Sequence, residues 1–557
     1  MSIPHVAIAA LLSAFILSFL LGIVLFLRNP GKPILDRILL AILPVCGTIA
    51  SLLAVRHIVY TVFPSWSGAR LAFVAAIRYG YSYYYPPDTG PVFTFPYPPL
   101  HPFSYLPVTF LFSSPTALVL AGSSLGFLYA LVPQIWLYFR REPGSAKDPI
   151  GNSARLICFA LFAGTLFALS YGIFPVRSEA PMLAFCAFAA VPLLRRGDLS
   201  WSSALVSATL LVLAIWAKQT ALPAAIAMPL YLLLADGRRS AFRFVGAFIL
   251  AAVPVSSLFV LGFGGKVLFF NLVQYPSQHN WFRYTCFVET EGKNDYSIAT
   301  TVLQRLTSMT WMAQHYLNEY SAVLLTACLV AGVSLLFALH GNPVSLREWF
   351  ATRRWLIFFC MSAALAPMGI ANRVKVGGED SAFAGCLYFL TTGLLLGLRD
   401  WSCLPYYGER LAKGVLLLLL LLYSALALPK FASFPGLLAG LPHNPQQSAY
   451  DYLKAHPGRA FFPWTPLAAL LVEGAWYHFD FAVDEHRSSG YPVSPDHFRK
   501  HIPPQFEFIA FPPLFGDYQP RAILKYLPEF SETVSLPELG APSGPWTVFR
   551  KPRKPAP

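Results

Sequence analysis

The chain has 557 residues, of which 56% are hydrophobic and only 12% are charged. A soluble domain carries about 25% charged residues, so this composition excludes an ordinary water-soluble enzyme. The net charge of +14 does not require a nucleic-acid partner, because many of the 41 basic residues fall in short segments between long apolar runs. We therefore predict an all-α polytopic membrane protein.

Apolar runs recur along the chain at roughly the 17–25 residues that cross a hydrocarbon core of about 30 Å. The first run is predicted to be a retained helix, because it is too long for a signal peptide and follows no basic segment. The apolar stretch 201–235 is predicted to be a hairpin with Lys218 at its outer tip. The twelve predicted membrane helices are 5–27, 38–56, 116–139, 156–174, 179–194, 201–217, 220–235, 243–262, 320–339, 355–371, 382–398 and 414–429.

Alternate connections between these helices are rich in Arg and Lys, which by the positive-inside rule places them in the cytoplasm. The basic residues of these connections are Arg28, Lys32, Arg37, Arg140, Arg141, Lys147, Arg155, Arg195, Arg196, Arg238, Arg239, Arg243, Arg347, Arg353, Arg354, Arg399, Arg410 and Lys413. Both termini and the long connections then lie outside. These are a first outer loop at 57–115, a second at 263–319, a short loop at 371–381, and the tail.

The tail after about residue 430 has more charge and no long apolar run. We predict a transmembrane module at 1–429 and a small extracytoplasmic α/β domain at 430–557. Within the tail, 446–458 and 519–530 are predicted to be helices, and 459–464, 506–511 and 546–552 are predicted to be strands. The eight cysteines show neither a disulfide framework nor a metal-ligand spacing.

Polar side chains gather at the predicted outer ends of the helices, whereas the helix interiors lack carboxylates. A transporter site near the midplane is therefore disfavoured. Cations from several outer connections suit a phosphate held at the lipid surface, and contact with lipid headgroups is the alternative. The residues concerned are Arg70, Arg78, Asp88, His101, Arg177, Glu179, Lys218, Gln219, His279, Arg283, Arg373, Lys375, Glu379 and Asp380.

Four segments, in their order, resemble the polytopic GT-C-class glycosyltransferases, which include the protein mannosyltransferases and the lipid A aminoarabinose transferases. The resemblance covers roughly residues 55–400. The segments are "AFVAAIRYGYSYYYPPDTGPVFTFPYPPLHPFSYLP" (72–107), "FPVRSEAPMLAF" (174–185), "WAKQTALPAAIAMPLYLLL" (216–234) and "VGGEDSAFAGCLYFLTTGLLLG" (376–397).

The resemblance implies transfer of a hexose or pentose from a polyprenyl-phosphate donor to a hydroxyl of a lipid, glycan or protein acceptor. The reaction would occur at the outer face of a bacterial plasma membrane and would invert the anomeric carbon. A carboxylate would act as base and cations would stabilise the leaving phosphate. No fixed cofactor is implied, and a divalent cation is compatible with the family. The implied base is one of Asp88, Glu179 and Asp380. The implied substrate-binding residues are Arg177, Lys218, Gln219, Arg373, Lys375, Tyr97 and His101.

The chain departs from this family in the first outer loop. Relatives carry one or two acidic residues ahead of the first interfacial helix, whereas "PSWSGARLAF" (64–73) has none, and Asp88 is the only acidic residue of the loop. Either Asp88 is the base, or Glu179 or Asp380 is, or the chain is an inactive relative that binds a polyprenyl lipid or a glycan. Asp88 in "PPDTG" also suits an ordinary turn. A transporter or flippase is a further alternative.

Overall fold

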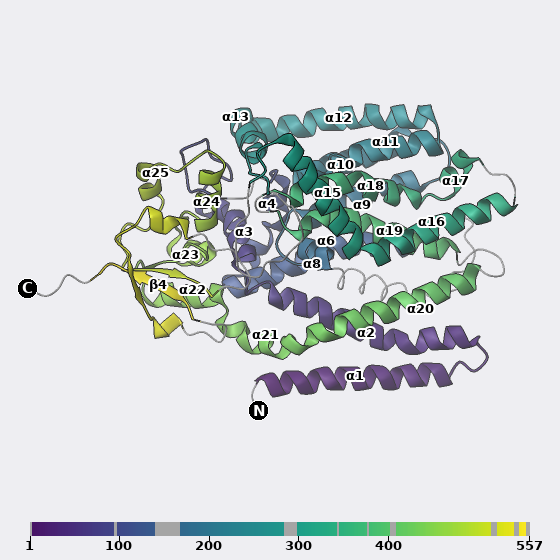
Figure 1. Ribbon diagram of the computed structural model, residues 1–557, viewed down its shortest axis with the longest axis horizontal. Coiled ribbons are helices and arrows are strands. Elements are labelled where there is room, and N and C mark those ends of the chain that lie inside the picture. Colours follow the sequence, from purple (N-terminus) through teal and green to yellow (C-terminus); the bar gives the residue numbers. More distant parts are fainter. Residues whose placement is uncertain are drawn as a thin grey trace, which may run out of the picture.

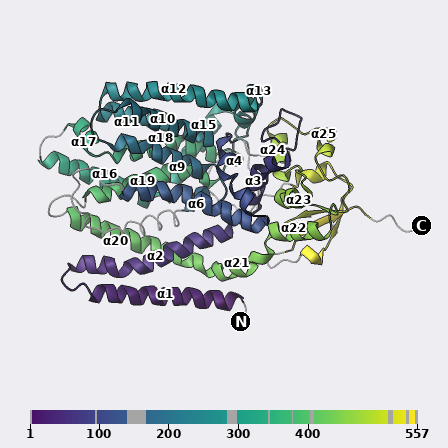
Figure 2. The ribbon, with the colours of Figure 1, turned by 180° about the vertical axis from the view of Figure 1, so that it is seen from behind.

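The computed structural model describes residues 3–93, 97–139, 167–282, 298–341, 345–375, 378–401, 408–513, 521–539 and 545–552. Figure 1 shows a bundle of long, roughly parallel helices with a small sheet domain at one end. The N-terminal end of α1 lies toward the same end as that domain, also when seen from behind in Figure 2. An even number of membrane crossings places the two ends of a chain on the same side of the membrane, which agrees with this arrangement.

Within the described ranges, seven helices are long and apolar enough to cross a membrane. Two further helices, α15 and α16, pass the same test as one pair bent by 75°, and α9, α10 and α11 are shorter apolar helices. The seven are α1 (Ile3–Leu27), α2 (Ile34–Tyr60), α6 (Pro115–Phe139), α12 (Arg238–Phe263), α18 (Leu356–Arg373), α19 (Ala384–Trp401) and α20 (Gly408–Ala427). The others are α9 (Glu179–Ala190), α10 (Trp201–Ala217), α11 (Ala224–Ala235), α15 (Val302–Glu319) and α16 (Ser321–Gly341).

The predicted membrane helices each have a counterpart among these elements, except that 156–166 lie outside the described residues and only α8 (Phe167–Ile173) follows them. Helix α19 lies at the centre of the bundle with nearly all of its side chains buried, and α18, α16 and α20 pack against it. The chain reverses direction at Lys218, as the hairpin prediction requires, since Leu199 N just before α10 donates to Ser240 Oγ just after α11 at 3.2 Å. The placement of Lys218 on the outer side stays a prediction.

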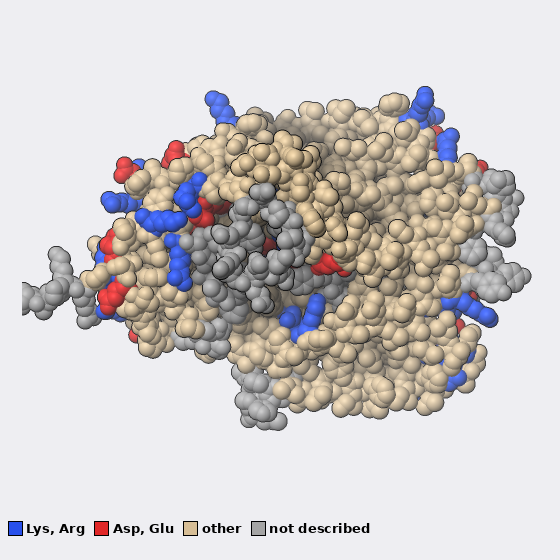
Figure 3. All heavy atoms as spheres, in the orientation of Figure 1, with Lys and Arg blue, Asp and Glu red and all other residues tan. Residues whose placement is uncertain are grey.

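The outer surface of the bundle is apolar, which is expected where lipid replaces water. Leu250, Leu261 and Leu418 are each at least 60% exposed. Figure 3 shows Lys, Arg, Asp and Glu gathered toward the two ends of the molecule, with a broad uncharged region between them. At the end away from the sheet domain, Arg354 pairs with Asp236 at 2.5 Å. These features describe a polytopic membrane protein.

Several short elements connect the bundle to the sheet domain. They are α3 (Ser65–Ala75), α4 (Leu100–Tyr105), α5 (Val108–Leu111), α13 (Gly265–Phe269), α14 (Tyr275–Ser277) and α21 (Phe434–Gly440), while α17 (Leu346–Thr352) lies at the opposite end. The apolar core between α3 and the sheet domain is continuous, because Trp66 on α3 packs edge-on against Trp464 and Phe479.

The sheet has four strands in the order β1-β2-β4-β3, with β1 and β2 parallel and the other neighbours antiparallel. The strands are β1 (Ala460–Phe461), β2 (Phe508–Phe511), β3 (Glu532–Val534) and β4 (Thr547–Arg550). The helices of this part are α22 (Pro445–Ala455), α23 (Pro466–Glu473), α24 (Asp480–Ser488) and α25 (Pro495–Lys500). Three predicted strands and the first predicted helix therefore have counterparts.

The predicted helix at 519–530 is wrong in the part that the structure describes. Residues Ala522–Lys525 form a single short 3-10 turn, and 514–520 lie outside the described residues. Arg521 interrupts the helix before Ala522, because its φ of 49° is left-handed, and Pro528 disfavours the helical conformation of Leu527.

Candidate active site

A cluster of charged and polar side chains, all buried except the half-buried Glu379, lies where the helix bundle meets the sheet domain. We define the charged cluster as Arg70, His101, Arg177, Glu179, Lys218 and Glu379. Five segments far apart in the sequence contribute to it: α3, α4, the segment before α9, the tip of the α10–α11 hairpin, and the segment before α19. All four segments that carry the family resemblance supply at least one of these residues.

Glu179 and Lys218 form the most deeply buried ion pair of the cluster. Lys218 Nζ lies 2.6 Å from Glu179 Oε1, and the two side chains are only 11% and 3% exposed. The break between α10 and α11 places Lys218 here, because the chain leaves the helix in an extended conformation and turns its side chain toward the start of α9. Lys218 Nζ also lies 5.4 Å from the centre of the Tyr97 ring.

Arg177 joins the segment before α9 to the segment before α19. One guanidinium nitrogen donates to Ser381 Oγ at 2.7 Å, and the other contacts the Glu379 carboxylate. Burial alone would lower the pKa of Arg177, but the contact with Glu379 outweighs it and raises that pKa. The same contact holds the pKa of Glu379 below its ordinary value, despite burial. Both groups are therefore charged at neutral pH. Tyr105 donates a hydrogen bond of 2.9 Å to the Arg177 carbonyl.

Arg70 and His101 complete the cluster from the first outer loop. Arg70 is 4% exposed, and burial together with the nearby Arg177 lowers its pKa to about 10. His101 is fully buried, and burial followed by the charge of Arg70 lowers its pKa to about 3, so the ring is neutral. Neither ring nitrogen of His101 has a hydrogen-bond partner in the described part of the chain. A buried polar group without a partner is costly, which makes His101 a candidate ligand contact.

Asp380 and Arg373 form a third ion pair, beside the cluster, with Arg373 Nε donating to Asp380 Oδ1 at 2.9 Å. The chain between them turns tightly at Gly378, where an added Cβ would lie 2.2 Å from the Asn372 carbonyl oxygen. This turn directs Glu379 toward Arg177 and Asp380 back toward Arg373. The close approach explains a glycine at this position.

The remaining predicted binding residues lie at different distances from the cluster. Tyr97 is part of its surroundings, since its ring lies beside Lys218 and 5.3 Å from the His101 ring. Gln219 is half-buried beside Lys218 at the hairpin tip. Lys375 instead places its Nζ over the ring of Trp281, in the second outer loop.

Asp88 lies in an exposed turn, away from Lys218 and Arg373. Its φ of 61° is in the left-handed region that Asp and Asn tolerate better than most residues, and Thr89 N donates to Pro86 O to close the turn. Asp88 lines a different cavity, together with His486 and His497 of the sheet domain. The small cavity beside Lys218 is bordered by Glu179 and Ser381 instead.

Two members of the charged cluster, Arg70 and Glu379, belong to the predicted set of outer polar residues but were not assigned a role as base or as substrate-binding residue. Every residue of α3 except Trp66 is buried, so a lone Arg within this otherwise uncharged helix is the signal that points to a function for Arg70. Glu379 and Asp380 are neighbours, and their sequence position alone does not tell which of them reaches Arg177. Among the described residues, no group of three His, Cys, Asp or Glu side chains is placed to hold a metal ion.

The sequence matches no protein-family model and no curated protein. Two solved structures are similar over most of the chain, both of ArnT from Cupriavidus metallidurans. The apo structure has 11% sequence identity and a TM-score of 0.49, with 86% of this chain and 92% of ArnT covered. The structure bound to undecaprenyl phosphate has 12% identity and a TM-score of 0.49, with 90% and 97% covered. A similarity at this level identifies neither a family nor an activity.

Proposed function

We propose that this protein is a membrane glycosyltransferase that moves a sugar from a polyprenyl-phosphate donor to an acceptor hydroxyl. The observation that carries the proposal is the charged cluster itself. The four segments that resemble GT-C glycosyltransferases, separate in the sequence, meet with Arg70 of α3 in one site, which holds three buried cations, the buried carboxylate of Glu179 and the half-buried carboxylate of Glu379. Burying so many charges is costly, and structures retain such groups chiefly where chemistry requires them.

In this proposal, Arg70, Arg177 and Lys218 bind the donor phosphate. Fixed cations in a site that excludes water stabilise the charge that develops on the leaving group. Glu179 is a positioning residue, because its buried carboxylate holds the Lys218 ammonium at 2.6 Å. His101 donates to the phosphate or to the acceptor from a ring nitrogen that has no partner in the described chain.

We assign the role of base to Glu379. Its side chain is 34% exposed, against 3% for Glu179, so an acceptor hydroxyl can reach it. Its contact with Arg177 keeps it ionised and able to accept a proton. The acceptor oxygen attacks the anomeric carbon from the face opposite the phosphate, and the carbon–oxygen bond to the phosphate breaks. The hydroxyl proton passes to Glu379, and the products are an inverted glycoside and polyprenyl phosphate.

The site faces the outer side of a bacterial plasma membrane in this proposal, because the basic turn between α1 and α2, and helix α17 with the Arg353 and Arg354 that follow it, lie at the end of the bundle away from the sheet domain (Figure 1). The transmembrane module 1–429 then binds the donor lipid, and the extracytoplasmic domain 430–557 covers the site.

The test is transfer of a labelled sugar from polyprenyl phosphate in membranes that contain the protein. The Glu379→Gln variant keeps the shape of the side chain but cannot take up a proton, so we expect kcat to fall by 10²–10⁴. The matched control is Asp88→Asn, which the left-handed turn tolerates and which leaves the cluster untouched. Loss of activity in the control with full activity in Glu379→Gln would refute the assignment and support Asp88 as base.

A further inference from the structure

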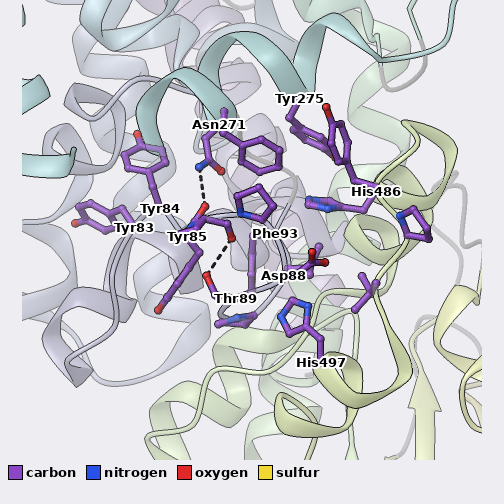
Figure 4. Close-up of a pocket in the computed structure, with 18 of the residues that line it drawn as sticks. Tyr83, Tyr84, Tyr85, Asp88, Thr89, Phe93, Asn271, Tyr275, His486 and His497 are labelled. Carbon is purple, nitrogen blue, oxygen red and sulfur yellow. Dashed lines mark hydrogen bonds between the residues drawn. The ribbon is translucent and has the colours of Figure 1, made fainter. Parts of the chain in front are cut away.

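A second cavity lies outside the charged cluster, between the two long outer loops and the sheet domain. It has a volume of about 230 Å³, and its lining includes residues from the segments 83–93, 270–275 and 476–497 (Figure 4). We call it the aromatic cavity, after the rings of Tyr83, Tyr84, Tyr85, Phe93, Phe270, Tyr275, Trp476 and Tyr491. Its lining contains none of the residues of the charged cluster.

The charge of the aromatic cavity excludes a phosphate ligand. Its described lining includes no Lys or Arg, and its one carboxylate is that of Asp88. Burial lowers the pKa of His486 to about 3, so this ring contributes no positive charge at neutral pH. An anion would therefore find no cationic partner here. A neutral or weakly polar ligand with a flat face fits the lining better.

The buried polar atoms of the lining that have no hydrogen-bond partner in the described chain include Trp476 Nε1 and His497 Nδ1. The indole N–H can only donate. His497 Nε2 lies 2.6 Å from the Gly90 carbonyl oxygen, which can only accept, so Nε2 carries the proton. His497 Nδ1 is then an acceptor in the neutral ring and a donor in the protonated ring. The cavity thus offers two polar atoms for a ligand, of which the indole N–H is a donor.

Hydroxyl groups satisfy both kinds of partner, since each donates one hydrogen bond and accepts others. Aromatic rings bind the C–H faces of a sugar ring while its hydroxyls bond to polar groups around the edge. A volume of about 230 Å³ is below the roughly 300–1,000 Å³ of pockets for drug-sized ligands, which suits a single ring rather than a long lipid chain.

We propose that the aromatic cavity is a saccharide-binding site that holds one sugar ring of the acceptor. Contacts of the first outer loop with the sheet domain and with the second outer loop form it. Val92 N donates to His478 Nδ1 of the sheet domain at 2.9 Å, and Asn271 Nδ2 of the second loop donates to the Tyr85 carbonyl at 2.9 Å. The assignment of the sugar to the acceptor rests on the transferase function proposed above, whereas saccharide binding itself does not.

The test is direct binding to the full-length protein in detergent, measured by saturation-transfer NMR with mannotriose, maltotriose and triacetylchitotriose as probes. Wild type is expected to bind at least one of them. Tyr491→Ala removes a half-buried ring of the cavity wall, and we expect Kd to rise about tenfold. Thr89→Trp fills the cavity from an exposed turn position and is expected to abolish binding.

The matched control is Tyr450→Ala, which removes a half-buried tyrosine from α22, outside the cavity, and should leave Kd unchanged. The transfer-deficient Glu379→Gln variant should bind the saccharide as wild type does. No signal from any of the three probes, or equal Kd values for wild type, Tyr491→Ala and Thr89→Trp, would overturn the proposal. Saccharide binding by a wild-type protein without transferase activity would overturn the acceptor assignment and leave the binding site supported.

Discussion

The buried pair Glu179–Lys218 allows a quantitative test of how the charged cluster is held together. At 2.6 Å and an effective dielectric constant of about 20, the attraction of the two charges is about 6 kcal/mol. Desolvation of each ion costs several kcal/mol, so the pair as a whole contributes little net stability. Removing one partner alone leaves a buried charge without its counterion, which costs about 3–5 kcal/mol.

A double-mutant cycle separates these terms. We expect Lys218→Met to lower the free energy of unfolding by about 3–5 kcal/mol and Glu179→Gln by a somewhat smaller amount, since the Gln side chain can still accept a hydrogen bond from Lys218. The double variant is expected to cost less than the sum of the two, with a coupling energy of about 2–3 kcal/mol. Equilibrium unfolding of the detergent-solubilised protein by increasing SDS mole fraction measures each value.

The exposed pair Arg239–Asp198 provides the control for this cycle. Its closest atoms are 3.6 Å apart and its side chains are 73% and 60% exposed, so we expect a coupling energy of about 0–1 kcal/mol from the corresponding Met and Asn variants. Strictly additive effects of Lys218→Met and Glu179→Gln would refute the reasoning, since they would mean that the two charges do not depend on each other. Transfer should be lost in all three cluster variants, including the double variant that regains stability.

Three further predictions concern other parts of the molecule. Arg177→Lys keeps the positive charge but loses the planar fork, so kcat should fall about 10²-fold in the transfer assay while the protein remains folded. Burial raises the pKa of Glu485 from its ordinary value near 4.5 to about 8, so the folded state binds an extra proton between these values. Stability should therefore fall as pH rises from about 4.5 to 8, and thermal unfolding of Glu485→Gln should lose this dependence. A cysteine in place of exposed Lys454 should react with a membrane-impermeant maleimide in intact cells, whereas one in place of Arg196 should not.

The membrane helices could be predicted from the sequence because their signal is local. A run of apolar residues of the right length can be recognised without knowing which segments it contacts. The difference in Arg and Lys content between its two ends then predicts its orientation in the membrane. The hairpin at Lys218 was found in this way and is present in the structure. The prediction of a helix at 519–530 gave no weight to Pro528, and the described residues Ala522–Lys525 form only a short turn.

The candidate site was only partly predictable, because its geometry depends on contacts between distant segments. Sequence motifs indicated Arg177, Glu179 and Lys218, which do lie together. They gave no means to tell that Asp88, in the loop with the strongest resemblance, occupies an exposed left-handed turn beside the sheet domain. The tight turn at Gly378 determines which carboxylate pairs with Arg177. The turn produces no periodic pattern in the sequence from which it could be predicted.

The pairing of Arg177 with Glu379 links the two halves of the proposed reaction. A donor phosphodiester carries one negative charge, and its phosphate gains a second as the bond to the sugar breaks. Glu379 loses its own charge when it takes the acceptor proton, so Arg177 then loses the counterion that it contacts, while the more distant Glu179 stays paired with Lys218. The cation is thus available to the leaving group at the stage when charge develops there, which stabilises the transition state more than the ground state.

This coupling predicts opposite effects of Glu379→Gln on binding and on turnover. The variant removes a negative charge from the neighbourhood of the phosphate, so the donor should bind at least as tightly as in wild type, while kcat collapses. Binding of a labelled polyprenyl-phosphate sugar to the purified protein, together with single-turnover transfer, measures both quantities. Asp380→Asn, the corresponding change at a carboxylate whose partner is Arg373, serves as the control and should leave donor affinity within about twofold of wild type. Weaker donor binding in Glu379→Gln would show that Glu379 holds Arg177 in place for the phosphate, and would contradict its role as a base that releases Arg177 during the reaction.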